Sequence, residues 1–164
     1  MDTVQALGGP IGAAAVTTHL DELGMHYELI THKPTFRAVD DAAASGVTPP
    51  FELKTLVLRD GPDLVLVALP ASERLDLGKV RELLGHRDVG LADEDEMAAA
   101  FPRFDVGALP PIGPGLPPLA LLDARVKDYS RVVCAGGDHS HSLVVIPIEL
   151  IDRSRPRLAD ICED

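Results

Sequence analysis

The sequence predicts an α/β (mixed α+β) fold, in which helices pack on a mixed or antiparallel sheet. The chain has 164 residues, enough for one domain with a sizeable core, and 46% of them are hydrophobic, a composition that argues against disorder. Hairpin-like strand pairs are interspersed with short helical patterns, an order that disfavours a doubly wound parallel sheet. Aromatic residues make up only 4% and Trp is absent, so Leu, Val, Ile and Ala have to form the core.

The first half of the chain contains the clearest hairpin. Two apolar runs flank the turn residues Asp60-Gly61-Pro62-Asp63, a typical hairpin connection. In chain order, the expected elements are a loose arm over 1–12, a helix over 13–23 ending at Gly24, a strand over 26–30, a loop over 32–35, a short helix from Asp40 or Asp41 to Gly46, and the hairpin strands 54–59 and 64–69.

The second half alternates capped helices with short strands. Asp76 and Asp93 are predicted as N-caps, since each precedes a helical pattern. The expected elements are helices over 76–84 and 93–100, a Pro- and Gly-rich loop over 101–118, strands over 88–91, 119–122, 131–135 and 142–146, and a final helix from Pro147. We therefore expect an arm over 1–12, a domain over 13–151 and a polar tail over 152–164.

Charge and cysteine content limit the partners. A net charge of −11 argues against a broad phosphate-binding surface, so DNA is not an expected partner, although a small pocket gripping one end of a nucleic acid is compatible with it. Cys134 and Cys162 show neither a metal-binding spacing nor a disulfide framework, which indicates a reducing compartment, the cytoplasm. We expect no signal peptide and no membrane partner, because no apolar run approaches the roughly 18 residues that a span needs.

Lys54 opens the apolar run Leu53-Lys54-Thr55-Leu56-Val57-Leu58, which predicts a strand entering the core. A buried lone charge is costly, so this lysine needs a physical explanation. Either its stem extends so that the ammonium reaches water, or the ammonium lines a pocket as an anion anchor or stabiliser of a developing oxyanion. The residue type and position alone leave both interpretations open.

Two further segments are candidates for chemistry. Gly136-Gly137-Asp138-His139-Ser140-His141 precedes a strand, and glycines there allow backbone amides to approach a ligand. The His-x-His pair is compatible with a zinc half-site or with structural histidines, but no third ligand has a motif spacing. The loop Gly107-Ala108-Leu109-Pro110-Pro111-Ile112-Gly113 is either a stiff surface loop or a rigid pocket wall.

Taken together, these segments resemble the YbaK/prolyl-tRNA synthetase-associated editing domain family. The resemblance rests on Lys54-Thr55-Leu56-Val57-Leu58-Arg59, on Leu69-Pro70-Ala71, on Arg74-Leu75-Asp76-Leu77, and on the loop and glycine–histidine segments, with His32-Lys33-Pro34 upstream. It extends from about Val16 to Ile151. The order and spacing of the motifs, rather than any single one, make it specific.

The resemblance implies a curved, barrel-like mixed sheet and an aminoacyl-tRNA deacylase. The expected substrate is a tRNA 3′ acceptor end with a wrong amino acid attached by an ester, and the expected reaction uses no metal and no cofactor. The resemblance implies that the catalytic residues are Lys54, Gly137 and His141. It implies that the substrate-binding residues are His32, Arg37, Gly107, Ala108, Gly113, Asp138 and Ser140.

Some features depart from the family pattern. Arg37 stands where a Thr is common, and Ile112 stands where a Phe is common in the Pro-Pro-Phe-Gly loop, so either residue alters the expected pocket. The acidic charge suggests an alternative, a non-catalytic binding module of the same fold that recognises a small molecule or a protein. A third hypothesis is a metal hydrolase using His139 and His141. A homodimer through an exposed sheet edge is also compatible with the sequence.

Overall fold

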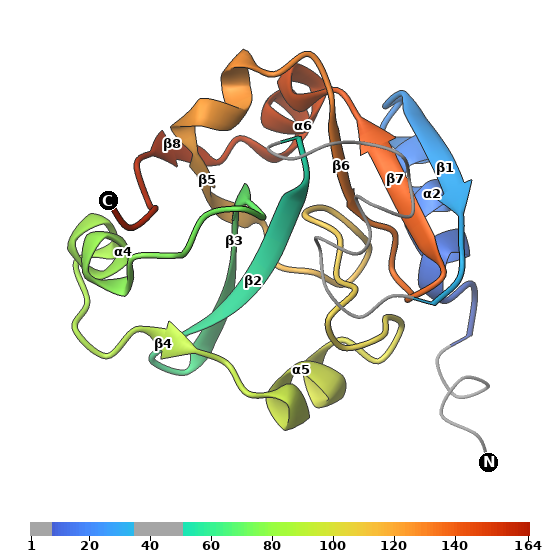
Figure 1. Ribbon diagram of the computed structural model, residues 1–164. Coiled ribbons are helices and arrows are strands. Elements are labelled where there is room, and N and C mark those ends of the chain that lie inside the picture. Colours follow the sequence, from blue (N-terminus) through green and yellow to red (C-terminus); the bar gives the residue numbers. More distant parts are fainter. Residues whose placement is uncertain (1–7, 35–50) are drawn as a thin grey trace.

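The computed structural model describes residues 8–34 and 51–164, and it shows a mixed α/β architecture with two sheets (Figure 1). The first sheet has three antiparallel strands in the order β1 (Tyr27–Thr31), β7 (His141–Val145) and β6 (Val132–Ala135). Helix α2 (Gly12–Glu22) contributes Ala15, Val16 and Leu20 to an apolar cluster that also contains Leu143 and Val145. The buried face of α2 therefore covers this sheet.

The second sheet has five strands in the order β4-β2-β3-β5-β8. Its strands are β2 (Leu53–Asp60), β3 (Asp63–Pro70), β4 (Gly90–Leu91), β5 (Leu119–Asp123) and β8 (Arg157–Ala159). Strand β2 pairs antiparallel with β3 and β4, whereas β3–β5 and β5–β8 are parallel pairs. The expected mixed sheet is thus confirmed, and so is the hairpin, whose strands are each one residue longer at both ends.

The two sheets remain separate within the described ranges. Strands β2 and β6 approach each other, and a single parallel bridge joins Glu52 to Val133. The five-stranded and three-stranded sheets are not linked by a continuous ladder. The expected closure into a barrel-like sheet is therefore not confirmed.

The β2–β3 hairpin is buried on both faces, which explains its nearly continuous apolar sequence. Val57 and Leu66 belong to the apolar cluster shared with α2, whereas Leu58 and Val67 belong to a second cluster. The second cluster also contains Val80 of helix α4 and Ile161 near the C-terminus. The hairpin consequently forms the common wall of two cores.

The predicted helix caps are confirmed. The Asp76 carboxylate accepts the amide of Lys79 at 3.0 Å, at the start of α4 (Leu77–Leu84), and Gly85 ends that helix in the left-handed conformation. Asp93 and Glu96 form a reciprocal capping box at the start of α5 (Glu94–Ala100). The remaining elements are the 3₁₀ helix η1 (Ala124–Asp128) and helix α6 (Pro147–Ser154).

The C-terminal residues pack into the fold, although a polar tail is expected over 152–164. Strand β8 extends the five-stranded sheet by pairing with β5, and Ile161 and Cys162 are fully buried. The Asp76 amide donates to the Ile161 carbonyl at 2.8 Å. The segment is polar in composition, but the two buried side chains of Ile161 and Cys162 anchor it to the fold.

Two further expectations concern a short helix before β2 and the absence of a membrane-spanning helix. The short helix from Asp40 or Asp41 to Gly46 lies outside the described residues. In the described part of the chain, no helix is long and apolar enough to cross a membrane.

Candidate active site

The turn between β6 and β7 is shaped by two glycines. The amide of Gly136 donates to the carbonyl of His141 at 3.0 Å and closes the turn. Gly137 has φ +98°, and a Cβ at this position would lie 2.8 Å from the carbonyl oxygen of Gly12 at the start of α2. Only glycine fits here without moving the helix, because both the conformation and the space exclude a side chain.

Asp138 and His141 form a hydrogen-bonded pair within this turn. His141 Nδ1 lies 2.7 Å from Asp138 Oδ1, and 27% of each side chain is exposed. An ionised carboxylate only accepts hydrogen bonds, so Nδ1 donates to Asp138 and Nε2 is the ring nitrogen left to accept a proton. This is the arrangement of a general base whose ring is oriented by a carboxylate.

Backbone amides fix the carboxylate of Asp138. Oδ1 also accepts the amide of Ser140 at 3.0 Å, and Oδ2 accepts the amide of Ala13 in the first turn of α2 at 3.1 Å. Burial would raise the pKa of Asp138, but the hydrogen bonds from His141 and the two amides outweigh it and lower that pKa below its usual value. Asp138 is therefore ionised at neutral pH and holds His141 in one orientation.

The loop before β5 packs directly on this turn. The amide of Gly137 donates to the carbonyl of Ala108, and the amide of Asp105 donates to the carbonyl of Gly137, both at 3.0 Å. The amide of His139 lies 3.3 Å from Asp105 Oδ2. Gly107 has φ +86°, and a Cβ there would lie 3.6 Å from His139 Cε1. The structure thus brings Gly107 and Ala108 to the predicted glycine–histidine segment.

His32 joins the same site from the end of β1. Its amide donates to the Ser140 carbonyl at 2.9 Å, and its Nε2 lies 2.8 Å from the hydroxyl of Ser142. Nδ1 lies 2.6 Å from the Lys33 carbonyl, which can only accept, so Nδ1 donates and Nε2 accepts from the Ser142 hydroxyl. His32 therefore supports the turn from the end of β1.

Lys54 lies in different surroundings. Its cross-strand partner is Leu69, which belongs to the second core cluster, so Lys54 shares the face of β2 that packs toward α4 and the C-terminus. Nζ donates to the carbonyl of Glu73 at 2.5 Å. Burial lowers the pKa of Lys54, and the nearby Arg74 lowers it further.

Gly113 and Arg37 are not placed in this constellation by the structure. A Cβ at Gly113 would lie 3.2 Å from Leu116 and 3.3 Å from Phe104, so this glycine permits tight packing inside the loop. Arg37 lies outside the described residues. The described residues also contain no group of three His, Cys, Asp or Glu side chains that could hold a metal ion, so a third ligand to His139 and His141 is lacking there.

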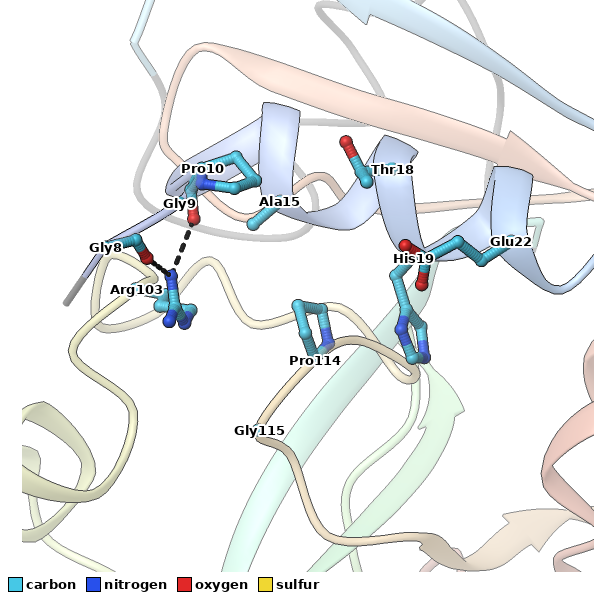
Figure 2. Close-up of a pocket in the computed structure, with 10 residues that line it drawn as sticks. All are labelled: Gly8, Gly9, Pro10, Ala15, Thr18, His19, Glu22, Arg103, Pro114 and Gly115. Atoms are coloured by element: carbon cyan, nitrogen blue, oxygen red, sulfur yellow. Dashed lines mark hydrogen bonds between the residues drawn. The ribbon is translucent and has the colours of Figure 1, made fainter.

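Two cavities flank the loop. One of about 240 Å³ lies between β2, β4, α5 and the loop, and its lining includes Thr55, Val57, Leu91, Met97, Gly107 and Leu109. A cavity of about 410 Å³ lies beside α2, and its lining includes Thr18, His19 and Glu22 of the helix and Pro114 and Gly115 of the loop; the His19 ring points toward Pro114 (Figure 2). Arg103 donates to the carbonyls of Gly8 and Pro10 at its other side. The smaller cavity is lined by Gly107, a predicted site residue, whereas none of the predicted site residues that the structure describes lines the larger one.

Comparison with known proteins identifies the family. The model of the aminoacyl-tRNA editing domain matches residues 32–152, which is most of the chain. The chain belongs to the aminoacyl-tRNA editing domain family. All ten predicted site residues of this editing domain lie within the matched range, and they include the turn and the loop described above.

Individual relatives agree with this assignment. The chain is 29% identical over 101 residues to the prolyl-tRNA editing protein ProX of Acetoanaerobium sticklandii, a match covering 60% of this chain and 61% of that protein. A solved structure named as a candidate trans-editing enzyme for prolyl-tRNA synthetase superposes with a TM-score of 0.82 and 28% identity, covering 93% of this chain and 97% of the other. A scaffold protein from a computational epitope-grafting study is similar, with a TM-score of 0.81, 29% identity and the same coverage.

Sequence reasoning missed Asp105 and Ser142 as parts of the site. Asp105 touches both His139 and Gly137, and its sequence signal was an acidic residue inside a loop of Pro, Gly and apolar residues. Ser142 is fully buried and holds His32, a contact between residues 110 positions apart that no local pattern indicates.

Proposed function

We propose that this editing domain is a trans-acting aminoacyl-tRNA deacylase, which hydrolyses the ester between a wrong amino acid and the 3′ end of a tRNA. The observation that carries the proposal is the Asp138–His141 pair, with 2.7 Å between Oδ1 and Nδ1, inside a family-matched region and beside the Gly107 loop. A carboxylate-oriented imidazole is suited to activating water for attack on an ester.

In the proposed reaction, His141 Nε2 accepts a proton from water as the water oxygen bonds to the ester carbonyl carbon. The bond from that carbon to the ribose oxygen then breaks, and the same proton passes to the ribose oxygen. The products are the free amino acid and the tRNA with its hydroxyl restored. Asp138 holds the ring in place and stabilises the imidazolium that forms between the two transfers.

The developing oxyanion needs positive charge or hydrogen-bond donors. The amide of Gly137 already donates to Ala108, so we assign Gly137 a shape-setting role in the turn. Lys54 is the proposed source of positive charge, as the family resemblance implies. Its ammonium has three hydrogens and gives one to the Glu73 carbonyl, so acting on the substrate requires it to extend from that position.

The test is a deacylation panel over tRNAs carrying different wrong amino acids, with the unmodified protein, Lys54→Ala and His141→Ala. We expect release of at least one amino acid, and a loss of about 10²- to 10⁴-fold in rate for His141→Ala. Hydrolysis no faster than in a protein-free control, for every charged tRNA, would overturn the proposal. Binding of a non-hydrolysable aminoacyl-adenosine without any turnover would instead indicate a binding module.

We also propose a cytoplasmic location and a tRNA partner contacted mainly through its acceptor end. Cys134 and Cys162 are both buried, and their spacing in the sequence shows no disulfide framework, which suits a reducing compartment. A homodimer stays a prediction, with β1 as the edge strand that would pair, since Leu29 on this strand is exposed. Sedimentation equilibrium of the unmodified protein tests that prediction.

A further inference from the structure

The cavity beside Gly107 has a position that ties it to the proposed chemistry. Gly107 lines this cavity and also faces His139, and the next residue, Ala108, accepts the amide of Gly137. Gly107 therefore separates this cavity from a group bound beside the Asp138–His141 turn. A Cβ at Gly107 would lie 3.6 Å from His139 Cε1, so a side chain at this position would stand between the cavity and the glycine–histidine segment.

The chemistry of the cavity is almost entirely apolar. Strand β2 contributes Leu56 and Val57, the segment at β4 contributes Leu91 and Ala92, and α5 contributes Met97. Thr55 has the only polar side chain among the described lining residues, and its hydroxyl oxygen is buried. A charged or amide-bearing group entering here would lose its water and would find the unpaired hydroxyl of Thr55 as its single side-chain partner among the described lining residues, so the cavity favours hydrocarbon.

The size of the cavity sets a lower limit on the group that fills it. Its volume of about 240 Å³ exceeds the ~150 Å³ of an apolar protein cavity that binds benzene. The methyl group of alanine would leave most of this space empty, whereas a valine or leucine side chain would fill far more of it. Met97, which is flexible and half-buried, can adapt to small differences in shape.

We infer that this cavity receives the side chain of the aminoacyl group and selects aliphatic side chains larger than that of alanine. The inference rests on the proposed deacylase function and adds the substrate class. The 3′-linked amino acid would lie with its ester at the Asp138–His141 turn and its side chain past Gly107. The apolar lining excludes basic, acidic and amide side chains. An alanyl ester is a poor substrate because its methyl group is too small to contact most of the lining.

The test compares one tRNA transcript charged with alanine, valine, leucine or lysine. We expect kcat/KM for the leucyl or valyl ester to exceed that for the alanyl ester at least tenfold, since each methylene in such a pocket is worth about 10- to 200-fold. The lysyl ester should be the slowest. Equal rates for alanyl and leucyl esters, or a preference for alanyl, would overturn the inference.

A matched pair of variants locates the selectivity. Ala92→Leu adds bulk inside the cavity, whereas Ala98→Leu adds the same bulk at an exposed position of α5 that is not part of the lining. We expect Ala92→Leu to lower the leucyl-to-alanyl rate ratio at least tenfold and Ala98→Leu to leave it unchanged. If Ala92→Leu does not fold, Met97→Ala provides the opposite change, and it should improve hydrolysis of a phenylalanyl ester. An unaltered ratio in the folded cavity variants contradicts the inference.

A binding measurement separates this inference from the proposed function. Non-hydrolysable 3′-amide analogues of leucyl- and alanyl-adenosine report on the cavity without any reaction. Tighter binding of the leucyl analogue, lost in Ala92→Leu, supports the cavity assignment even where no ester is hydrolysed, in which case only the deacylase proposal fails. Hydrolysis with no side-chain preference in either assay keeps the deacylase and removes the cavity assignment.

Discussion

His141 and Lys54, the two ionisable side chains among the predicted catalytic residues, lie in unlike surroundings. His141 sits in a turn where glycine geometry, an ionised Asp138 and the first turn of α2 hold each other in place. Lys54 lies on the opposite side of the β2–β3 hairpin from the core that α2 covers, with its ammonium on the Glu73 carbonyl. The turn orients the side chain of His141, whereas the Lys54 ammonium has to leave the Glu73 carbonyl before it can supply charge to a substrate.

That network reaches the C-terminal segment. Arg125 forms an ion pair with Glu73 at 2.9 Å and lies 3.5 Å from the buried Asp123, whose Oδ2 accepts from Cys162 Sγ at 3.1 Å. Burial, together with the hydrogen bond to Asp123, raises the pKa of the Cys162 thiol to about 12, so the thiol stays protonated and can donate. The turn around His141 and the surroundings of Lys54 therefore depend on different parts of the chain. Separate substitutions can test the role of each.

The largest expected effect is on catalysis at the turn. His141→Ala should lower the deacylation rate about 10²- to 10⁴-fold, because it removes the proposed general base. The matched control is His26→Ala, which removes a histidine paired with Glu149 at 2.8 Å outside the site and should leave the rate unchanged. Comparable losses in both variants would show that the turn has no special role.

The second effect concerns the stability of the Lys54 side. Asp123→Ala should lower the free energy of unfolding by about 3 kcal/mol, because the buried donors at Ile161 and Cys162 and the partly buried amide of Arg125 lose their acceptor. The control is Asp128→Ala, at an exposed position of the 3₁₀ helix η1 that Asp123 caps. It should change the free energy of unfolding by less than about 0.5 kcal/mol. Urea unfolding measures both, and equal values would contradict the network.

The third effect concerns the shape of the turn. Gly137→Ala should lower the free energy of unfolding by about 2 kcal/mol, through backbone strain at φ +98° and the contact with the Gly12 carbonyl. Gly24→Ala has a similar strain, at φ +68°, but its Cβ would meet nothing within 4 Å. The difference between the two variants in the free energy of unfolding, measured with denaturant, isolates the contact with α2. Equal values would mean that α2 moves away from the new methyl group without cost.

The smallest effect is a pH dependence carried by Asp138. Its pKa is lower in the folded protein than in the unfolded chain, so its contribution to stability is present above the unfolded value of about 3.9 and is lost as the pH falls through the folded value. Asp138→Asn should therefore cost about 1 kcal/mol at pH 7 and progressively less as the pH falls below 4. Urea unfolding at several pH values checks this, and a difference independent of pH would refute the assignment.

The sequence by itself determined the helix caps and the hairpin, and it indicated the glycine–histidine turn as a site. The Asp76 and Asp93 caps and the Asp60–Asp63 hairpin turn follow from local chemistry, because a cap or a tight turn involves residues only two or three positions apart. The family resemblance likewise rested on local motifs, and it indicated the glycine–histidine segment before any contact was known.

Only the tertiary structure decided which distant residues contact the glycine–histidine turn and the C-terminal segment. The clamp of Asp138 by Ala13 joins positions 125 residues apart, and the burial of Ile161 and Cys162 depends on a parallel pairing with β5. Such contacts depend on how distant segments pack, and packing is not encoded in any local spacing. The face on which Lys54 lies was decided the same way, by strand register, because a shift of one residue would have turned its ammonium toward the other core.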